Sequence, residues 1–367
     1  MLVTEPGRQD PANMSKFCIL PKAKLPEWVD DLVAHHRVFG PKVSGHGYAF
    51  GPVVRFDDMD LKYRQSRLSP KKFLLPQREL LYEYETSGMR LSPSSDPSCT
   101  IVFGVHTCDQ HAIRLLDRVF LQGIADQHYR VRRDATILIG LECLRPCSSE
   151  SFCRSMGTTS PATDVVDLHL VDLGTEYSIE IHSSRGAKLM AAFRGAFAAS
   201  HNDLERRDAV LKAKWKQFPY SLDCDVTDLS PLLAECAESP YWDELGAACL
   251  GCGACTQVCP TCSCFDIEDD VTLSLSTGKR LRIWDSCQLN QFAKVAENHD
   301  FRPARAARQR HRFMRKGKYQ YDQHDMVGCV GCGRCGTACL AGITPIRTFN
   351  ELSRRQKQLS PERQDLE

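Results

Sequence analysis

The chain has 367 residues and a hydrophobic fraction of 42%, enough to bury a sizeable core and to form two or three domains. Its 47 basic and 46 acidic residues give a formal net charge of +1, so no overall field favours nucleic acid or an anionic membrane. No apolar run approaches the roughly 20 residues of a transmembrane helix, and the N-terminus lacks the apolar segment of a secretory signal. These features predict a cytoplasmic protein with no membrane span and no nucleic-acid partner.

Residues 21–220 have the pattern of an α/β domain, which follows a flexible lead-in over residues 1–20. A β-rich run at 100–106, an amphipathic segment at 109–121 and an apolar run at 135–141 predict a strand, a helix and a strand. This βαβ unit implies a parallel sheet with a right-handed crossover. Further predicted elements are a helix at 26–37, strands at 164–173 and 176–182, and helices at 186–199 and 203–217.

Prolines between residues 219 and 240 mark a domain boundary. Beyond it, residues 241–350 alternate cysteine-rich loops with predicted helices and form a mostly α domain of the two-cluster ferredoxin type. One internal repeat is visible, because CLGCG at 249–253 returns as CVGCG at 329–333. The highly charged tail at 351–367 is expected to be a frayed helix or disordered.

The 19 cysteines point to metal binding, because a long chain without an export signal does not need a disulfide framework. Two segments have the spacing C-x2-C-x2-C-x3-C, in which three cysteines bind one cubane and the fourth binds the neighbouring one. Glycines inside both loops allow a close backbone approach to a cluster. The pattern predicts two 4Fe–4S clusters, the first held by Cys249, Cys252, Cys255 and Cys339, the second by Cys329, Cys332, Cys335 and Cys259.

Zinc is the alternative, but zinc modules use two C-x2-C knuckles a dozen or more residues apart rather than three evenly spaced cysteines. Roughly 70 residues separate the two motifs, and the helix-prone segment 288–298 predicts a helical insertion between them. Cys262, Cys264 and Cys287 are either small buried hydrophobic residues or ligands, in a further cluster or in an alternate ligand set.

A third site is predicted where two strands end. Cys108 follows the first strand of the βαβ unit and Cys143 follows the second, and the carboxyl ends of parallel strands meet at one edge of a sheet. Cys147 and Cys153 lie in the same loop as Cys143. Four thiols at one crevice predict a third 4Fe–4S cluster, with another metal or unligated thiols as the alternatives.

No G-x-G-x-x-G and no P-loop lysine occur, so a built-in dinucleotide site is not expected. The basic run Arg302–Lys318 has no acidic residue and is either a solvated helix face or a group of cations that offsets cluster charge or docks an acidic partner. With no nucleophile beside a base, the sequence predicts an electron carrier rather than a catalyst. The alternative from another class is an enzyme that reduces a substrate in the α/β crevice; a redox sensor would need a DNA-binding element that is not found.

Six segments together resemble the iron–sulfur beta subunit of cytoplasmic sulfhydrogenase-type nickel–iron hydrogenases, a family that includes the A subunit of anaerobic sulfite reductase. The segments are PKKFLLPQRE (70–79), FGVHTCDQHAIRLLDRVFL (103–121), CPTCSCFDIED (259–269), RIWDSCQ (282–288), HDFRP (299–303) and GCVGCGRC (328–335).

The resemblance implies a subunit that relays electrons between a flavin-containing NAD(P)H-oxidising partner and the small and large hydrogenase subunits. In the sulfite reductase, the catalytic partner is a sirohaem subunit, which is the near alternative. The resemblance also implies that Cys108, Cys143 and Cys153 belong to a functional site. Relatives tend to have Cys-Phe-Cys where this chain has Ser151-Phe152-Cys153, so Cys147 is expected to replace the missing ligand.

Overall fold

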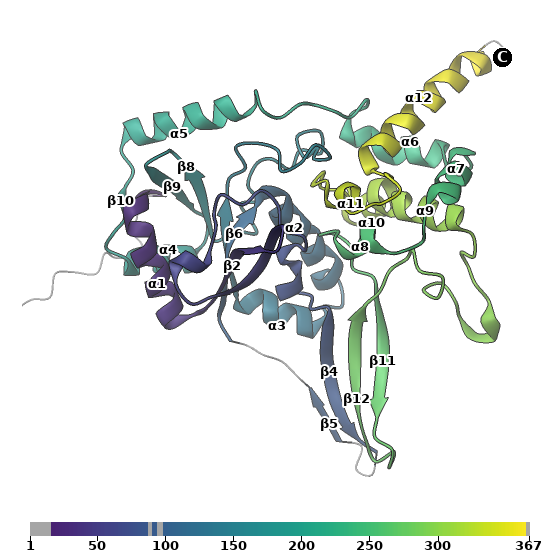
Figure 1. The fold of residues 1–367 in the computed structure, drawn as a ribbon, viewed down its shortest axis with the longest axis horizontal. Helices are drawn as coiled ribbons and strands as arrows, with labels where there is room; N and C mark the ends of the chain where they lie inside the picture. The colour runs from purple at the N-terminus through teal and green to yellow at the C-terminus, as the bar shows by residue number, and fades with distance from the viewer. Residues whose placement is uncertain (1–15, 87–89, 94–97, 365–367) are drawn as a thin grey trace, which may run out of the picture.

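The computed structural model describes residues 16–86, 90–93 and 98–364 (Figure 1). Its largest feature is an eight-stranded sheet with the strand order β10-β1-β9-β8-β7-β6-β2-β3. These strands are β1 (Phe17–Pro21), β2 (Arg37–Ser44), β3 (Gly47–Val53), β6 (Thr100–His106), β7 (Thr136–Leu141), β8 (Leu168–Asp172), β9 (Glu176–Ile181) and β10 (Phe197–Ala198).

The sheet is mixed, which corrects the prediction of a parallel sheet. β2, β6, β7 and β8 are parallel neighbours and form its centre. The pairs β2–β3 and β8–β9 are antiparallel, as are β9–β1 and β1–β10. The reason is that the chain turns back after β2 and after β8 through connections too short for a parallel crossover.

The predicted βαβ unit is confirmed. β6 and β7 pair in parallel and are connected through α2 (Thr107–Leu121) and α3 (Gln127–Ala135). Ile113, Leu116 and Phe120 form the buried stripe of α2, as their helical spacing predicts. All six residues of β7 are buried, which is typical of a strand covered on both faces. This unit brings the end of β7 and the first turn of α2 to the same edge of the sheet.

Three further helices accompany the sheet, namely α1 (Leu25–His35), α4 (Ser184–Ala192) and α5 (His201–Lys214). Strand β1 begins at Phe17 and buries Ile19 and Leu20 in the core, so residues 17–20, which were predicted to belong to a flexible lead-in, are part of the sheet. Residues 1–15 of that lead-in lie outside the described residues.

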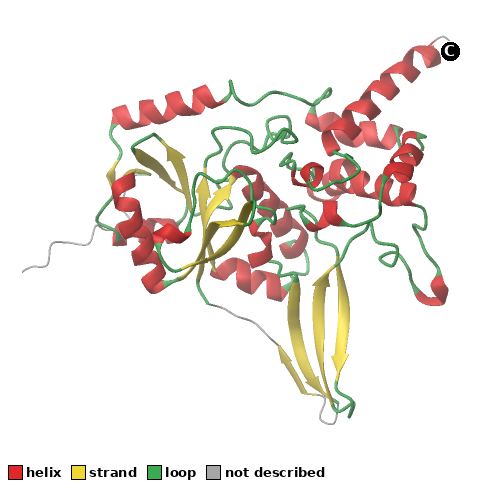
Figure 2. Cartoon of the chain, in the orientation of Figure 1, coloured by secondary structure: helices red, strands yellow, loops and turns green. Residues whose placement is uncertain are grey.

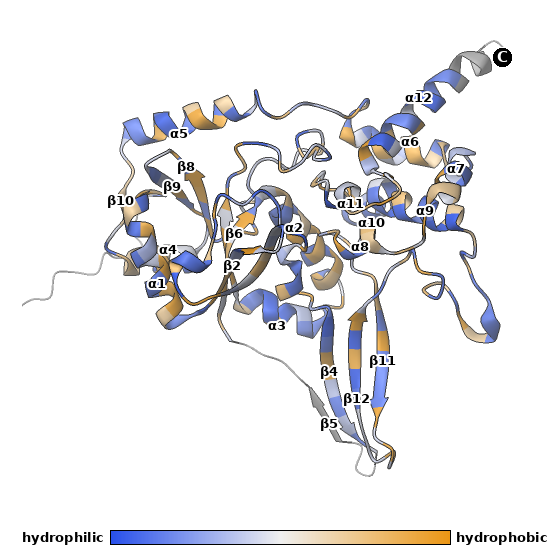
Figure 3. Cartoon of the chain, viewed as in Figure 1, coloured by the Kyte–Doolittle hydropathy of each residue, from blue (hydrophilic) through white to orange (hydrophobic). Residues whose placement is uncertain are grey.

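A second, antiparallel sheet of four strands, called the arm here, projects from the body (Figures 1 and 2). Its order is β11-β12-β4-β5, with β4 at Arg78–Glu85, β5 at Arg90–Pro93, β11 at Phe265–Val271 and β12 at Thr277–Trp284. β4 and β12 each carry both polar and apolar residues (Figure 3). The arm therefore joins a segment of the predicted α/β domain to the segment between the two cysteine motifs.

The prediction of a helical insertion between the motifs is wrong for its first half. The insertion begins with the hairpin β11–β12, and within 288–298 only Ala296–Asn298 forms a helical turn. Two tertiary contacts override the local propensity: β12 pairs along β4, and the buried Gln288 side chain donates to the carbonyl of Arg308 at 2.9 Å.

Helices make up most of the remaining C-terminal part. They are α6 (Leu229–Glu235), α7 (Tyr241–Ala248), α8 (Ala254–Gln257), α9 (Arg305–Met314), α10 (Gln320–His324), α11 (Arg334–Thr337) and α12 (Pro345–Gln364). A π-helical turn, Arg315–Tyr319, connects α9 to α10. The charged tail continues α12 as far as Gln364 and buries Leu352 in an apolar cluster with Trp242 and Phe313, while residues 365–367 lie outside the described part.

Candidate metal centres

The two repeated cysteine loops have the same backbone conformation. Gly251 and Gly331 have φ angles of 67° and 66°, and Gly253 and Gly333 have φ angles of 76° and 78°. Such angles favour glycine over residues with a Cβ. The second glycine of each loop precedes a short helix, α8 or α11, and these two helices pack against each other. The sequence repeat is therefore also a structural repeat.

The four predicted ligands of the second cluster come together. A narrow cavity is lined by Cys259, Cys329, Cys332 and Cys335, and also by Cys255 of the first predicted set. Burial raises the pKa of the Cys332 thiol to about 12, so iron must displace a proton when it binds there. Three thiols from one motif and one from the other are the donors that a 4Fe–4S cluster requires, so these residues fit that cofactor.

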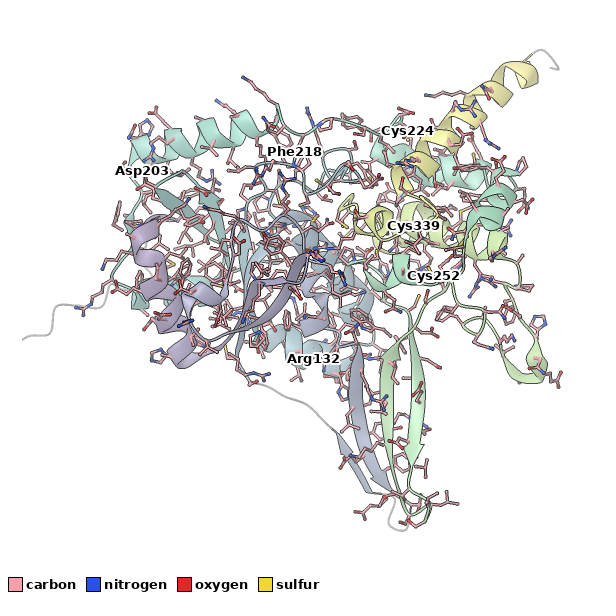
Figure 4. All side chains as sticks on the ribbon, viewed as in Figure 1. Arg132, Asp203, Phe218, Cys224, Cys252 and Cys339 are labelled. Atoms are coloured by element: carbon pink, nitrogen blue, oxygen red, sulfur yellow. The ribbon has the colours of Figure 1, made fainter. Side chains whose placement is uncertain are left out.

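The first motif is arranged around Cys249, which is buried, whereas Cys252 is exposed. Two donors point at Cys249 Sγ: the Gln309 side-chain amide at 2.8 Å and the N–H of Gly251 at 3.3 Å. Hydrogen bonds to sulfur stabilise a thiolate ligand. Cys339, the predicted fourth ligand, packs at the edge of the apolar cluster that contains Cys249. Figure 4 labels Cys252 and Cys339, and both lie in the helical part of the molecule.

Part of the basic run faces the cysteines. Arg308, Arg312 and Lys316 recur at every fourth residue along α9 and the π-helical turn, and all three are buried. Although burial alone would lower it, the pKa of the Arg312 guanidinium is raised by Cys255 of the first motif and Cys335 of the second. Arg312 and Lys316, which both have cysteine neighbours, fit the prediction that cations offset cluster charge. Arg308 instead donates to the carbonyls of Arg302 and Pro303. The exposed and half-buried members of the run fit the alternative of a solvated helix face.

A buried lysine that the sequence analysis missed binds backbone carbonyls at the end of the first motif. Lys71 is 3% exposed, and its Nζ donates to the carbonyls of Cys259 at 2.8 Å and Cys262 at 2.7 Å. The ammonium also lies 4.1 Å from the centroid of the Trp284 ring. Lys71 lies in segment 70–79, which is one of the segments that carry the family resemblance. No local pattern, however, predicts a contact with residues so distant in the sequence.

The four strand-end cysteines lie together at the predicted edge of the sheet. Cys108 is in the first turn of α2, and Cys143, Cys147 and Cys153 follow in the loop after β7. The thiols of Cys143 and Cys147 form a hydrogen bond. Burial raises the pKa of Cys108, and it raises that of Cys153 to about 12. Phe218, labelled in Figure 4, packs on Cys143 and Cys153. The donor set fits a further cluster.

This third group of cysteines is in direct contact with the second motif. The N–H of Phe152 donates to the carbonyl of Gly331 at 2.8 Å, and Cys108 packs with Cys332 in one apolar cluster. A Cβ placed on Gly331 would lie 2.7 Å from backbone atoms of Cys153. The loop after β7 and the second cysteine loop are therefore neighbours with no intervening layer.

A buried ion pair, also missed by the sequence analysis, links the same two places. Nη1 and Nη2 of Arg334 each donate to a carboxylate oxygen of Asp109 at 2.7 Å, and the two side chains are 2% and 1% exposed. Arg334 also donates to the carbonyl of Ser66 at 2.9 Å. Asp109 follows Cys108 on α2, and Arg334 lies between two cysteines of the second motif.

The remaining cysteines near the first motif form two contacts. The thiol of Cys262 hydrogen-bonds that of Cys259, and the thiol of Cys264 hydrogen-bonds that of Cys287. Cys287 is buried, whereas Cys262 and Cys264 are partly exposed. Within the described residues no three Cys, His, Asp or Glu side chains gather as ligands of a single metal ion.

The sheet, the repeated cysteine loops and the cations around them define an iron–sulfur protein that transports electrons through 4Fe–4S clusters. Residues 248–343 match the family model of a 4Fe–4S dicluster domain. The chain is 31% identical over 296 residues to sulfhydrogenase 2 subunit beta of Pyrococcus furiosus, a match covering 80% of this chain and 86% of the relative. The chain belongs to this family of sulfhydrogenase beta subunits.

No solved structure matches the chain. In the described ranges, no helix combines the length and apolar character needed to cross a bilayer.

Proposed function

We propose that this chain is the electron-transfer iron–sulfur subunit of a multisubunit, NAD(P)-linked nickel–iron hydrogenase. It would relay electrons between a flavin reductase subunit and the small and large hydrogenase subunits. The observation that carries the proposal is the similarity to a sulfhydrogenase beta subunit, which extends over 80% of the chain and not only over the cluster domain. A cytoplasmic location follows from the same proposal and is supported by the reliance on reduced cysteines.

Three ligand sets belong to the proposal. They are Cys249, Cys252, Cys255 and Cys339 for the first cluster, Cys329, Cys332, Cys335 and Cys259 for the second, and Cys108, Cys143, Cys147 and Cys153 for the third. When bound, a 4Fe–4S cluster supplies one-electron transfer at a potential set by sulfur hydrogen bonds, burial and nearby charge. The second set is supported best, because all four of its thiols line one cavity.

The protein's own residues set the conditions for that transfer. Gln309 donates to the sulfur of Cys249, and the buried Arg312 stabilises negative charge on either motif. The Phe152–Gly331 contact holds the third cysteine group against the second motif. Because the second motif adjoins both other groups, the proposed order of electron transfer is third, second, first, in either direction.

The experiment that tests the function uses the chain co-purified without oxygen with its flavin and hydrogenase partners. NAD(P)H should bleach the iron–sulfur absorption of the chain through the flavin subunit, and hydrogen should bleach it through the hydrogenase subunits. The Cys108→Ser variant should lose about four iron atoms per chain and slow the transfer between NAD(P)H and hydrogen at least tenfold. Cys99→Ser is the matched control, because Cys99 is exposed and precedes β6 at its opposite end.

Three outcomes would each contradict part of the proposal. A Cys108→Ser chain with the iron content of the control would remove the third cluster. Co-purification with a sirohaem protein, with sulfite rather than hydrogen as the partner's substrate, would replace the hydrogenase by the sulfite reductase alternative. A chain that reduces a substrate without any partner would instead support the enzyme alternative.

A further inference from the structure

Two cysteines outside the proposed ligand sets meet at the base of the arm. Cys264 immediately precedes β11, and Cys287 follows shortly after the end of β12. The hairpin pairing begins at Phe265 opposite Trp284 and extends one step further, because the N–H of Asp285 donates to the carbonyl of Cys264 at 3.0 Å. This register places Cys264 opposite Asp285, so Cys287 lies two residues beyond that position, close enough for the two thiols to form a hydrogen bond.

The two thiols differ in a way that suits redox chemistry. They hydrogen-bond each other, but Cys287 is only 5% exposed whereas Cys264 is partly accessible. The hydrogen bond from Cys287, helped by the cations Lys316 and Arg315, lowers the pKa of Cys264 to about 6. An accessible thiolate paired with a buried thiol is the usual arrangement of a redox-active dithiol. Two thiols alone are too few to hold a 4Fe–4S cluster or a structural zinc ion.

A short chain of polar contacts connects this pair to the first motif. The side-chain amide of Gln288 donates to Cys287 Sγ at 3.4 Å. The amide of Gln309 donates to Gln288 Oε1 at 2.8 Å and also to Cys249 Sγ at 2.8 Å. Cys287 is thus two side chains away from a proposed ligand of the first cluster, which gives electrons a continuous packed path.

We infer that Cys264 and Cys287 form a redox-active disulfide that exchanges electrons with the 4Fe–4S clusters of the dicluster domain. In its reduction, the sulfur–sulfur bond breaks and the disulfide accepts two electrons, one from each of two reduced clusters. One proton from solvent would convert Cys287 to a thiol while Cys264 remains a thiolate, and the two reduced clusters that supply the two electrons would return to their oxidised state. The disulfide–dithiol couple would therefore store two electrons, whereas each cluster transfers one electron at a time. The stored electron pair would be available to two-electron chemistry. The inference needs the two clusters of the dicluster domain, but neither the third cluster nor the hydrogenase partners.

The test counts electrons in the cluster-loaded full chain. The protein is treated with oxidised glutathione, freed of it without oxygen, and titrated with dithionite while the cluster absorption is followed. Wild type should consume two electrons per chain more than Cys264→Ser or Cys287→Ser before the titration is complete. Cys224→Ser, which changes a half-buried cysteine away from the arm, should behave as wild type.

Peptide mapping after alkylation provides the second measurement. The oxidised protein should yield a linked Cys264–Cys287 peptide, and the titrated protein should yield both cysteines alkylated. Free, alkylated cysteines in the oxidised protein would overturn the inference, as would equal electron consumption by wild type and the serine variants. Loss of iron in those variants would also overturn it, because it would make the two residues ligands. The mapping does not depend on cluster reduction, so it separates a failure of this inference from a failure of the proposed electron transfer.

Discussion

A buried guanidinium has lost its hydration shell and is stable only beside a compensating negative charge. For Arg312, the cysteines of the two motifs provide that charge. Arg312 is 3% exposed and lies among cysteines of both loops. Reduction of a cluster adds one more negative charge to this environment, so the arginine stabilises the reduced state more than the oxidised one. The effect of one residue on the driving force for electron transfer can therefore be measured.

Replacing Arg312 with methionine should lower the reduction potential of the nearer cluster by on the order of 50 mV or more. The measurement is a redox titration followed by electron paramagnetic resonance. Arg310→Met is the matched control, since Arg310 lies on the same helix, has a side chain that is 38% exposed and pairs with Glu238 at 2.9 Å. That variant should keep the wild-type potentials within about 10 mV, because an exposed charge is screened by solvent. Equal potentials in both variants would show that Arg312 does not act on the clusters.

The proposed cluster ligands could be predicted as a group because the spacing within each cysteine motif is local. Cys329, Cys332 and Cys335 stand at fixed intervals in one loop, and the structure brings them to one cavity together with Cys259. Lys71 and Arg334 could not be predicted in the same way. Their roles depend on contacts between segments far apart in the chain. The periodicity within one segment does not predict which distant residue it will contact.

At the scale of elements, the two cysteine loops are copies whose surroundings differ. Gly251 and Gly331 hold the same position in the repeat and nearly the same φ angle, 67° and 66°. A Cβ on Gly251 would meet nothing closer than 3.8 Å, whereas one on Gly331 would meet backbone atoms of Phe152 and Cys153 at 2.7 Å. Substituting alanine at each of these two glycines therefore separates the effect of the backbone conformation on stability from the effect of the neighbouring structure.

Gly251→Ala should cost only the strain of a left-handed alanine, roughly 1–2 kcal/mol of the free energy of unfolding. Gly331→Ala should cost more and should displace the loop after β7, because backbone atoms cannot move aside as a side chain can. Its iron content should fall by up to about four atoms per chain, since Cys153 moves with that loop. Iron analysis and urea unfolding without oxygen test both variants. If the two behaved alike, the loop after β7 would not be held by the second motif.

The elements themselves were predictable to the extent that their pattern is local. The βαβ unit was found because β6, α2 and β7 each carry their own periodicity and follow one another. The antiparallel outer strands and the arm could not be predicted in this way, since β12 pairs with β4 from a distant part of the chain. Segment 288–298 has the composition of a helix, but the buried side chain of Gln288 is used in contacts that a helix would not allow.

Over the whole molecule, the arm couples the sheet-containing part to the cluster-binding part. At its base, Glu79 of β4 forms an ion pair with Arg282 of β12 at 2.6 Å, and both side chains are 3% exposed. Further along the same two strands, Glu83 and Lys279 form a pair at 3.1 Å with exposures of 52% and 56%. The two pairs differ in burial but connect the same strands, which makes them a matched comparison.

Glu79→Gln should lower the free energy of unfolding by roughly 3–5 kcal/mol, because it leaves the buried Arg282 without its full counter-charge. Glu83→Gln should change it by less than about 1 kcal/mol, as is usual for exposed pairs. Urea unfolding without oxygen measures both. Nearly equal effects would mean that the base of the arm is hydrated and does not couple the two parts.

The arm also has a consequence for biosynthesis. β4 ends at Glu85 and its partner β12 begins at Thr277, so at synthesis rates of roughly 5–20 residues per second β4 waits on the order of 10–40 s for that partner to leave the ribosome. During that interval β4 presents an unpaired edge of the kind that recruits other chains. Binding by chaperones would therefore protect the nascent protein most during this interval. The arm is completed only after the first cysteine motif and most of the residues around it have been translated.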